Sequence, residues 1–124
     1  MEKHKRIMIV DDDVTMLEVL KRRLEAMGCL IDCASSGNEA LYVLETRWVD
    51  LIILSVVLHG DMYGYHLFKE IKKRKRLSRV PVVIYSDKVG MKGTFKKMGA
   101  EMFVEKPCSM DHFLRKIKRF IRKN

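Results

Sequence analysis

The sequence lacks features that would place the protein outside the cell or in a membrane. It has only three cysteines, an odd number that does not make a disulfide framework, so Cys29 and Cys33 are expected to fill the core. No apolar run is long enough to span a bilayer. The basic start of the chain is followed by only four apolar residues, too few for a secretory signal peptide. We therefore expect a cytoplasmic protein without a membrane span.

Internal repeats, linkers and low-complexity segments are also missing. The 124 residues are enough to bury one core but too few for an additional output module. We therefore expect a single domain over residues 1–124.

Positive charge is concentrated in the second half of the chain. Residues 1–68 contain 7 Lys and Arg against 11 Asp and Glu, whereas residues 69–124 contain 18 against 5. The net charge of the whole chain is +9. This asymmetry is typical of a basic face that meets an acidic partner, and equally typical of a solvated surface. Composition leaves both interpretations open.

Strand and helix patterns alternate five times along the chain. Short apolar runs predict the strands, and apolar stripes at helical spacing predict the helices, with caps at Asp13, Ser36 and Ser109. This alternation predicts an α/β fold with a parallel sheet that helices cover on both faces. The predicted strands are residues 6–10, 30–34, 50–55, 80–86 and 101–104. The predicted helices cover residues 14–27, begin after Ser36, run from Gly64 into the basic run 72–76, and begin after Ser109.

Polar residues stand at the ends of four of these strands. Because parallel strands end at one edge of a sheet, where ligands bind, these residues are expected to converge. In chain order they are Asp11 and Asp12 after the first strand, Ser55 on the third, Ser86 on the fourth, and Lys106 after the fifth, where Pro107 follows it. The series resembles the receiver domain of two-component response regulators, the CheY-like family, and the resemblance covers about residues 5 to 122.

The resemblance implies both a fold and a set of roles. The fold is a flavodoxin-like, doubly wound, five-stranded parallel sheet with strand order 2-1-3-4-5. Asp11 and Asp12 correspond to the acidic pair that holds Mg²⁺ in the family. The implied switch positions are Ser86, which binds a phosphoryl oxygen, Lys106, which pairs with the acyl phosphate, Phe103, whose rotamer reports the switch, and Pro107, which commonly follows a cis bond.

The segment after the fourth strand departs from the family, which usually has a full helix there. Only twelve residues separate Ser86 from Gly99, and Gly90 and Gly93 among them are poor helix formers. We expect a short, irregular or displaced fourth helix.

Ser55 stands where the family has the aspartate that accepts a phosphoryl group from a histidine kinase. A carboxyl group with a pKa near ~4 is already an anion at neutral pH, whereas a serine hydroxyl needs a base in contact. His59 is the histidine nearest in sequence, and we expect it to be an exposed loop residue. Phosphorylation of Ser55 is therefore not expected. Asp61, six residues further along, is an alternative acceptor.

The missing carboxylate also lowers the expected affinity for Mg²⁺, an ion that proteins usually hold with carboxylates and waters. Asp11 and Asp12 alone are expected to bind it weakly at best. Lys106 is expected to form an ion pair with them instead, so no cofactor should be required.

The resemblance thus implies a receiver-like signalling module, a pseudo-receiver of a two-component or phosphorelay system, that acts by protein–protein interaction and is not an enzyme. The expected partner is an acidic protein surface, for example on a signalling protein or a histidine kinase, and the oligomeric state is not predicted. The face implied by the family comprises the fourth segment, the fifth strand and the last helix. Its basic candidates are Lys88, Lys92, Lys96, Lys97, Arg115, Lys118, Arg119 and Arg122.

Two alternatives come from other classes of protein. Asp11 and Asp13 after an apolar strand also fit the Asp-x-Asp-x-Thr motif of haloacid-dehalogenase-like phosphatases, but that family needs a further acidic pair after its lysine, and only Asp111 follows Lys106 within the next helix. Nucleic-acid binding through the basic half is not favoured, because no reading helix, RNA-binding aromatic pair or zinc spacing is present.

Overall fold

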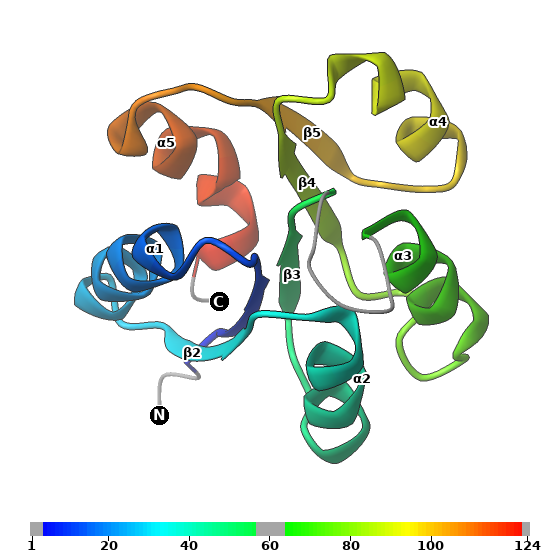
Figure 1. Ribbon diagram of the computed structural model, residues 1–124. Coiled ribbons are helices and arrows are strands. Elements are labelled where there is room, and N and C mark those ends of the chain that lie inside the picture. The colour runs from blue at the N-terminus through cyan, green and yellow to red at the C-terminus, as the bar shows by residue number, and fades with distance from the viewer. Residues whose placement is uncertain (1–3, 57–63, 123–124) are drawn as a thin grey trace.

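Five parallel strands form one sheet in the computed structural model, which describes residues 4–56 and 64–122 (Figure 1). The strand order is β2-β1-β3-β4-β5, so the predicted doubly wound fold is confirmed. The strands are β1 (Arg6–Val10), β2 (Leu30–Ala34), β3 (Leu51–Leu54), β4 (Val82–Ser86) and β5 (Met102–Glu105). The helices are α1 (Val14–Ala26), α2 (Gly37–Thr46), α3 (Gly64–Lys73), α4 (Lys92–Lys97) and α5 (Met110–Ile121), with a 3₁₀ turn at Val89–Met91.

The helices cover both faces of the sheet. Figure 1 shows α1 and α5 on one side and α2, α3 and α4 on the other. Each side has its own apolar core: Leu20 and Phe113 belong to the first, whereas Leu44, Phe68 and Phe95 belong to the second. Every residue of β3 and β4 is buried, as expected for strands with helices on both faces.

Three strand boundaries differ slightly from the predicted ones. β3 begins after Asp50, whose carboxylate accepts a hydrogen bond from the Arg6 backbone N–H at 2.9 Å. β4 begins after Pro81, which has no N–H to donate to a neighbouring strand. β5 extends to Glu105, because this residue pairs with Ser86 of β4.

The predicted helix caps are present. The side chains of Asp13, Ser36 and Ser109 each accept a hydrogen bond from the backbone N–H three residues ahead, at 3.1, 3.2 and 3.1 Å. At α2 the Glu39 carboxylate accepts from the N–H of Ser35 rather than from the cap residue itself. The caps fix where α1, α2 and α5 start relative to the strand ends.

The fourth helix is short, as predicted. α4 has 6 residues and follows the 3₁₀ turn directly. It is held to the sheet by the fully buried ring of Phe95, which packs beside Phe103 of β5 with the ring centroids 6.5 Å apart.

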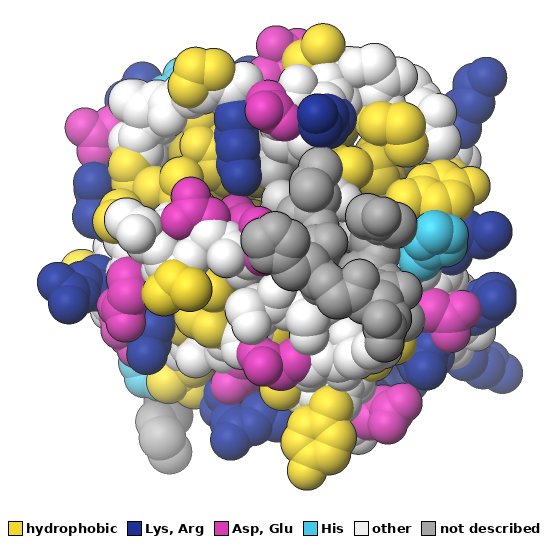
Figure 2. Space-filling model, viewed as in Figure 1, with side chains coloured by type: hydrophobic (Ala, Val, Ile, Leu, Met, Phe, Trp, Pro, Cys, Tyr) yellow, Lys and Arg dark blue, Asp and Glu magenta, His cyan; other side chains and the backbone are white. Residues whose placement is uncertain are grey.

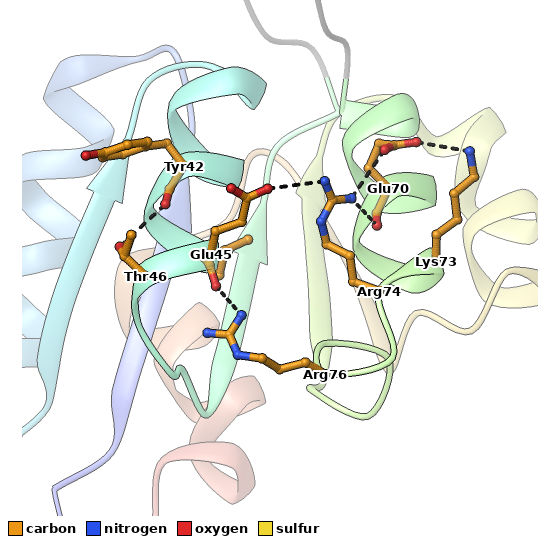
Figure 3. Close-up of polar contacts among 8 residues, drawn as sticks. Tyr42, Glu45, Thr46, Glu70, Lys73, Arg74 and Arg76 are labelled. Atoms are coloured by element: carbon orange, nitrogen blue, oxygen red, sulfur yellow. Dashed lines mark hydrogen bonds and ion pairs between the residues drawn. The ribbon is translucent and has the colours of Figure 1, made fainter.

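The basic run 72–76 is not simply a solvated helix end. α3 ends at Lys73, and the next residues turn back toward α2. Arg74 contacts the carboxylates of Glu70 at 3.2 Å and Glu45 at 3.4 Å, and the Arg76 guanidinium donates to the carbonyls of Leu44 and Arg47 at 2.6 and 2.8 Å. Figure 3 shows these contacts joining α2 to the end of α3.

None of the three cysteines forms a disulfide. Cys29 is buried but precedes β2 rather than belonging to it, whereas Cys33 lies on β2 and is half-buried. Among the described residues, no helix has the length and apolar character needed to cross a membrane.

Candidate functional site

The carboxyl ends of the parallel strands converge on a pocket of about 190 Å³. Strand register explains the convergence: Val10 pairs with Leu54 and Leu54 with Ile84, so the residues that follow them reach the same edge. The lining contains all five pocket positions predicted from the sequence together with Asp13 and Asp87. The lining residues are Asp11, Asp12, Asp13, Ser55, Ser86, Asp87 and Lys106.

Ser55 lies directly after β3, beside the end of β1. Its backbone N–H donates to the Val10 carbonyl at 2.9 Å, and only 6% of the residue is exposed. Gly64, the first residue of α3, packs against this turn and donates its N–H to the Val56 carbonyl at 2.8 Å. The backbone therefore holds a buried hydroxyl at the position where the resemblance implied a carboxylate.

Asp11 is engaged through both carboxylate oxygens. Oδ1 accepts from the Asp13 backbone N–H at 3.0 Å, and Oδ2 lies 3.2 Å from the Lys106 ammonium. Burial raises the pKa of the Asp11 carboxyl above its ordinary value, and the Asp13 N–H and the Lys106 charge oppose that rise. The predicted ion pair between Lys106 and the acidic pair is thus present.

Lys106 contacts a second partner on β4. Its ammonium lies 4.9 Å from the ring centroid of Tyr85, a distance suited to a cation–π interaction. Tyr85 in turn stacks on Phe113 of α5 and accepts a hydrogen bond from the Cys108 thiol at 3.6 Å. The lysine is therefore held between a carboxylate and an aromatic face.

The residues present fit a divalent cation poorly. Both Asp11 oxygens already have partners, and the Asp13 carboxylate caps α1. Within residues 4–56 and 64–122, no group of three or more His, Cys, Asp or Glu side chains is placed to hold a metal ion. Mg²⁺ takes a near-octahedral set of oxygens, usually one or two carboxylates with several waters, and at Asp11 an ion would have to displace the Lys106 ammonium.

The remaining switch positions lie where the resemblance implied. Ser86 is buried, and its Oγ accepts from the Lys88 backbone N–H at 3.0 Å. Phe103 is 8% exposed and packs inward against Phe95. The Lys106–Pro107 peptide bond is cis. His59 and Asp61 lie outside the described residues.

Sequence reasoning missed Asp87 and the pair formed by Tyr85 and Cys108. Asp87 follows Ser86 at the end of β4, so its position at a strand end was the available signal. The Tyr85–Cys108 contact joins β4 to the turn after β5 and has no local sequence signal.

The dehalogenase-like alternative does not match the geometry. Asp13 caps α1, and Asp111 lies in the first turn of α5, where its carboxylate pairs with Arg23. Asp111 is not among the residues that line the pocket.

Basic residues assigned to the predicted partner face lie along two different grooves, and their role in binding a partner stays a prediction. Lys92 of α4 and Lys116 of α5 line one groove of about 320 Å³ beside β5, here called the α4–α5 groove. Arg115 and Lys118 line a second groove of about 320 Å³ with Met27 of α1, here called the α1–α5 groove. Figure 2 shows acidic and basic side chains interspersed on the face that it presents. The other predicted basic residues, Lys88, Lys96, Lys97, Arg119 and Arg122, are all exposed.

Comparison with known proteins gives one consistent result. Residues 7–118 match the family described as the response regulator receiver domain. The chain is 33% identical over 119 residues to the transcriptional regulatory protein CrdR of Helicobacter pylori, which covers 94% of this chain and 54% of CrdR. The chain spans about half the length of the curated relatives it matches.

Solved structures of similar fold agree. A putative response regulator from Chloroflexus aurantiacus has a TM-score of 0.87 and 27% identity, over 96% of this chain and 98% of that one. The chemotaxis response regulator CheY4 of Vibrio cholerae has a TM-score of 0.86 and 21% identity, over 95% of this chain and 99% of that one. The second likeness concerns the fold alone.

Proposed function

The chain belongs to the response regulator receiver family, and we propose that it is a pseudo-receiver, which signals by protein–protein interaction without phosphorylation of Ser55. The observation that supports this most directly is the buried hydroxyl at the end of β3, at the family's phosphoacceptor position. A single receiver-like domain over residues 1–124 and a cytoplasmic location belong to the same proposal.

The chemistry of serine supports the proposal. An alcohol attacks phosphorus efficiently only when a neighbouring base takes its proton. Two of the four carboxylates that line the pocket have other engagements: Asp11 with Lys106 and the Asp13 N–H, and Asp13 with the start of α1. The histidine nearest in sequence, His59, lies outside the described residues. An aspartate at position 55 would need no such base, because its carboxylate is already an anion at neutral pH.

The state of the pocket supports weak Mg²⁺ binding at best and no required cofactor. In this proposal the Lys106–Asp11 pair neutralises part of the acidic cluster in place of a cation. Because Lys106 already pairs with Asp11 in this pocket, the proposal requires no small-molecule signal there.

The partner in this proposal is an acidic protein surface, such as a signalling protein or a histidine kinase, that docks on the α4–α5 groove. Lys92 of α4 and Lys116 of α5 line that groove together with Phe103 and Pro107. Charge complementarity of this kind increases association rates and orients the partner. Direct nucleic-acid binding has no comparable support.

Incubation with acetyl phosphate and Mg²⁺, followed by intact-mass spectrometry, tests the proposal. We expect no adduct on the natural chain and one hydroxylamine-labile phosphoryl group on the Ser55→Asp variant, which restores an anionic acceptor. A stoichiometric adduct on the natural chain would contradict the proposal. Its persistence in Ser55→Ala, with mapping to Asp61, would favour the displaced acceptor.

A capture experiment tests the docking surface. The double variant Lys92→Glu/Lys116→Glu should lose the acidic partner that the natural chain retains, because the charges of both lysines that line the groove are reversed. Lys75→Glu provides the control, since Lys75 is exposed after α3, away from this groove. Equal capture by all three proteins would count against the α4–α5 groove.

A further inference from the structure

The α1–α5 groove lies on the side of the sheet opposite to α2, α3 and α4 (Figure 1). Its volume is about 320 Å³, larger than the 190 Å³ of the pocket at the strand ends. Leu114 forms a mostly buried part of its lining, and Met27 at the end of α1 is 44% exposed beside it. An exposed methionine next to a leucine provides an adaptable apolar surface.

Positive charge surrounds this apolar surface. Arg23, Arg115 and Lys118 line the groove, together with only one carboxylate, Asp111. Asp111 is already paired with Arg23, and the charges of Arg23 and then Arg115 lower the pKa of its carboxyl. In the part of the chain that the structure describes, no carboxylate forms an ion pair with Arg115 or Lys118. The groove therefore carries excess positive charge.

The acidic residues of α1 do not neutralise the groove, because they lie on another side of the helix. Glu18 lines a depression with Cys33 of β2 and pairs with Arg22. Burial is the main cause that raises the pKa of the Cys33 thiol, and the charges of Glu18 and Glu25 add to that rise. The α5 side of α1 presents Arg23 and Met27 instead.

We propose that the α1–α5 groove binds a short acidic segment of a partner protein. One apolar side chain of the segment packs against Met27 and Leu114, and flanking carboxylates pair with Arg115 and Lys118. This surface is distinct from the α4–α5 groove, and the proposal does not depend on whether Ser55 can be phosphorylated.

Charge complementarity favours this occupant over the alternatives. A second copy of the chain docked here about a two-fold axis would bring Arg115 and Lys118 against the same residues of the other copy, because such an interface uses one patch twice. Like charges in contact would oppose that dimer. Nucleic acid supplies phosphates but no aliphatic side chain as long as that of leucine for the surface between Met27 and Leu114.

Fluorescence polarisation with defined peptides tests the proposal. The probe is a fluorescein-labelled peptide of alternating glutamate and alanine around one central leucine. We expect saturable binding that falls with salt. Replacing the central leucine by alanine, or the glutamates by glutamines, should each weaken binding, because each removes one of the two kinds of contact.

Charge-reversal variants at each of the two grooves show which groove binds the peptide. Arg115→Glu/Lys118→Glu should weaken the peptide by about tenfold or more, whereas Lys92→Glu/Lys116→Glu, which reverses the same number of charges at the other groove, should change it by less than about twofold. Both pairs are exposed, so circular dichroism should show a folded protein in each case. Met27→Ala should weaken only the leucine-containing peptide.

Methyl NMR locates the contact directly. The peptide should shift the methyl signals of Met27 and Leu114 before those of residues around the α4–α5 groove. Binding that depends on Lys92 and Lys116 instead, or unshifted Met27 and Leu114 signals, would overturn the proposal. So would a duplex DNA that binds with the same dependence on Arg115 and Lys118, or sedimentation of a dimer that the double variant dissociates.

Discussion

Gly64, the first residue of α3, allows that helix to pack closely against Ser55, the residue at the phosphoacceptor position. A Cβ atom built on Gly64 would lie 2.3 Å from the Ser55 carbonyl oxygen and 2.7 Å from the Val56 Cα. These neighbours are backbone atoms at the end of a buried strand, so they cannot move as the end of a flexible side chain would. The absence of a side chain is therefore a steric requirement here.

The Gly64→Ala variant should destabilise the protein by about 1–3 kcal/mol, the usual cost of overpacking a tight site. Urea unfolding followed by circular dichroism measures the change. Gly93→Ala is the matched control: no atom lies within 4 Å of its added Cβ, and alanine favours the α4 helix. Equal stability of Gly64→Ala and the natural chain would contradict the steric argument.

The phenol of Tyr85 should lose its proton at a higher pH than an exposed tyrosine does. Burial, the hydrogen bond from Cys108 and the charge of Asp11 raise the pKa of its phenol from an ordinary value near 10 to about 12. Because the folded-state pKa is the higher one, the folded protein retains the proton longer than the unfolded chain. This contribution to stability is fully present below pH 10 and is lost as the pH rises through 12.

Ultraviolet absorbance of tyrosinate measures this titration. Tyr85→Phe should remove the latest step from the curve of the folded protein and leave the earlier steps in place. Loss of an early step instead would show that the burial of Tyr85 does not govern its ionisation.

Among single residues, those at the ends of strands could be predicted from the sequence, whereas those defined by contacts between two elements could not. Asp11, Ser55, Ser86 and Lys106 meet because parallel strands end at one edge, which the apolar runs already indicate. The contact between Tyr85 and Cys108 and the packing of Gly64 on Ser55 depend on how one element lies on another. No local pattern encodes those distances.

In α5, helical spacing predicts the buried stripe but does not show which neighbouring element each exposed basic residue faces. Ser109 and the buried stripe of Phe113, Ile117 and Ile121 were predictable from spacing alone. Four basic residues of α5, Arg115, Lys116, Lys118 and Arg119, lie outside this stripe, and all of them except Lys116 were assigned to one partner face. Arg115 and Lys118 in fact face the α1 side, whereas Lys116 faces β5.

The turn after α3 makes a second element-level contribution. Arg76 donates to two carbonyls at the end of α2, where a helix leaves carbonyl groups without partners inside the helix. Figure 3 shows Arg76 reaching this end while Arg74 lies between Glu45 and Glu70. In the sequence these residues are only part of a run of positive charges, so this cap could not be assigned from it.

The Arg76→Ala variant should lower the free energy of unfolding by about 1–2 kcal/mol, because it removes two charge-assisted hydrogen bonds. Lys75→Ala, which removes the same charge from the neighbouring exposed residue, should change it by less than about 0.5 kcal/mol. Thermal unfolding of both variants measures the difference. Equal effects would show that net charge, rather than the contacts with α2, is responsible.

In the whole molecule, the acidic first half and the basic second half of the sequence do not form an acidic side and a basic side. The acidic first half contributes α1 and the basic second half contributes α5, yet these helices lie next to each other (Figure 1). Doubly wound connectivity therefore places Arg115 and Lys118 beside Arg23 and Met27. Residues from the two halves thus line two basic grooves and one largely acidic pocket.

The acidic pocket makes the stability of the fold a readout of the residue at position 55. In Ser55→Asp, a further buried carboxylate would join Asp11, Asp12 and Asp87 around the single cation of Lys106, and like charges this close destabilise one another. Without divalent cations this variant should unfold at a temperature about 4 °C or more below the natural chain, which corresponds to about 1 kcal/mol. Mg²⁺ should restore its stability, because an ion that binds only the folded state stabilises it by mass action.

The natural chain and Ser55→Asn, which has a similar shape without the charge, should respond little to Mg²⁺ in the same thermal scan. An equal gain for the natural chain would mean that its own side chains already complete a metal site, and the pocket would then be that of a competent receiver.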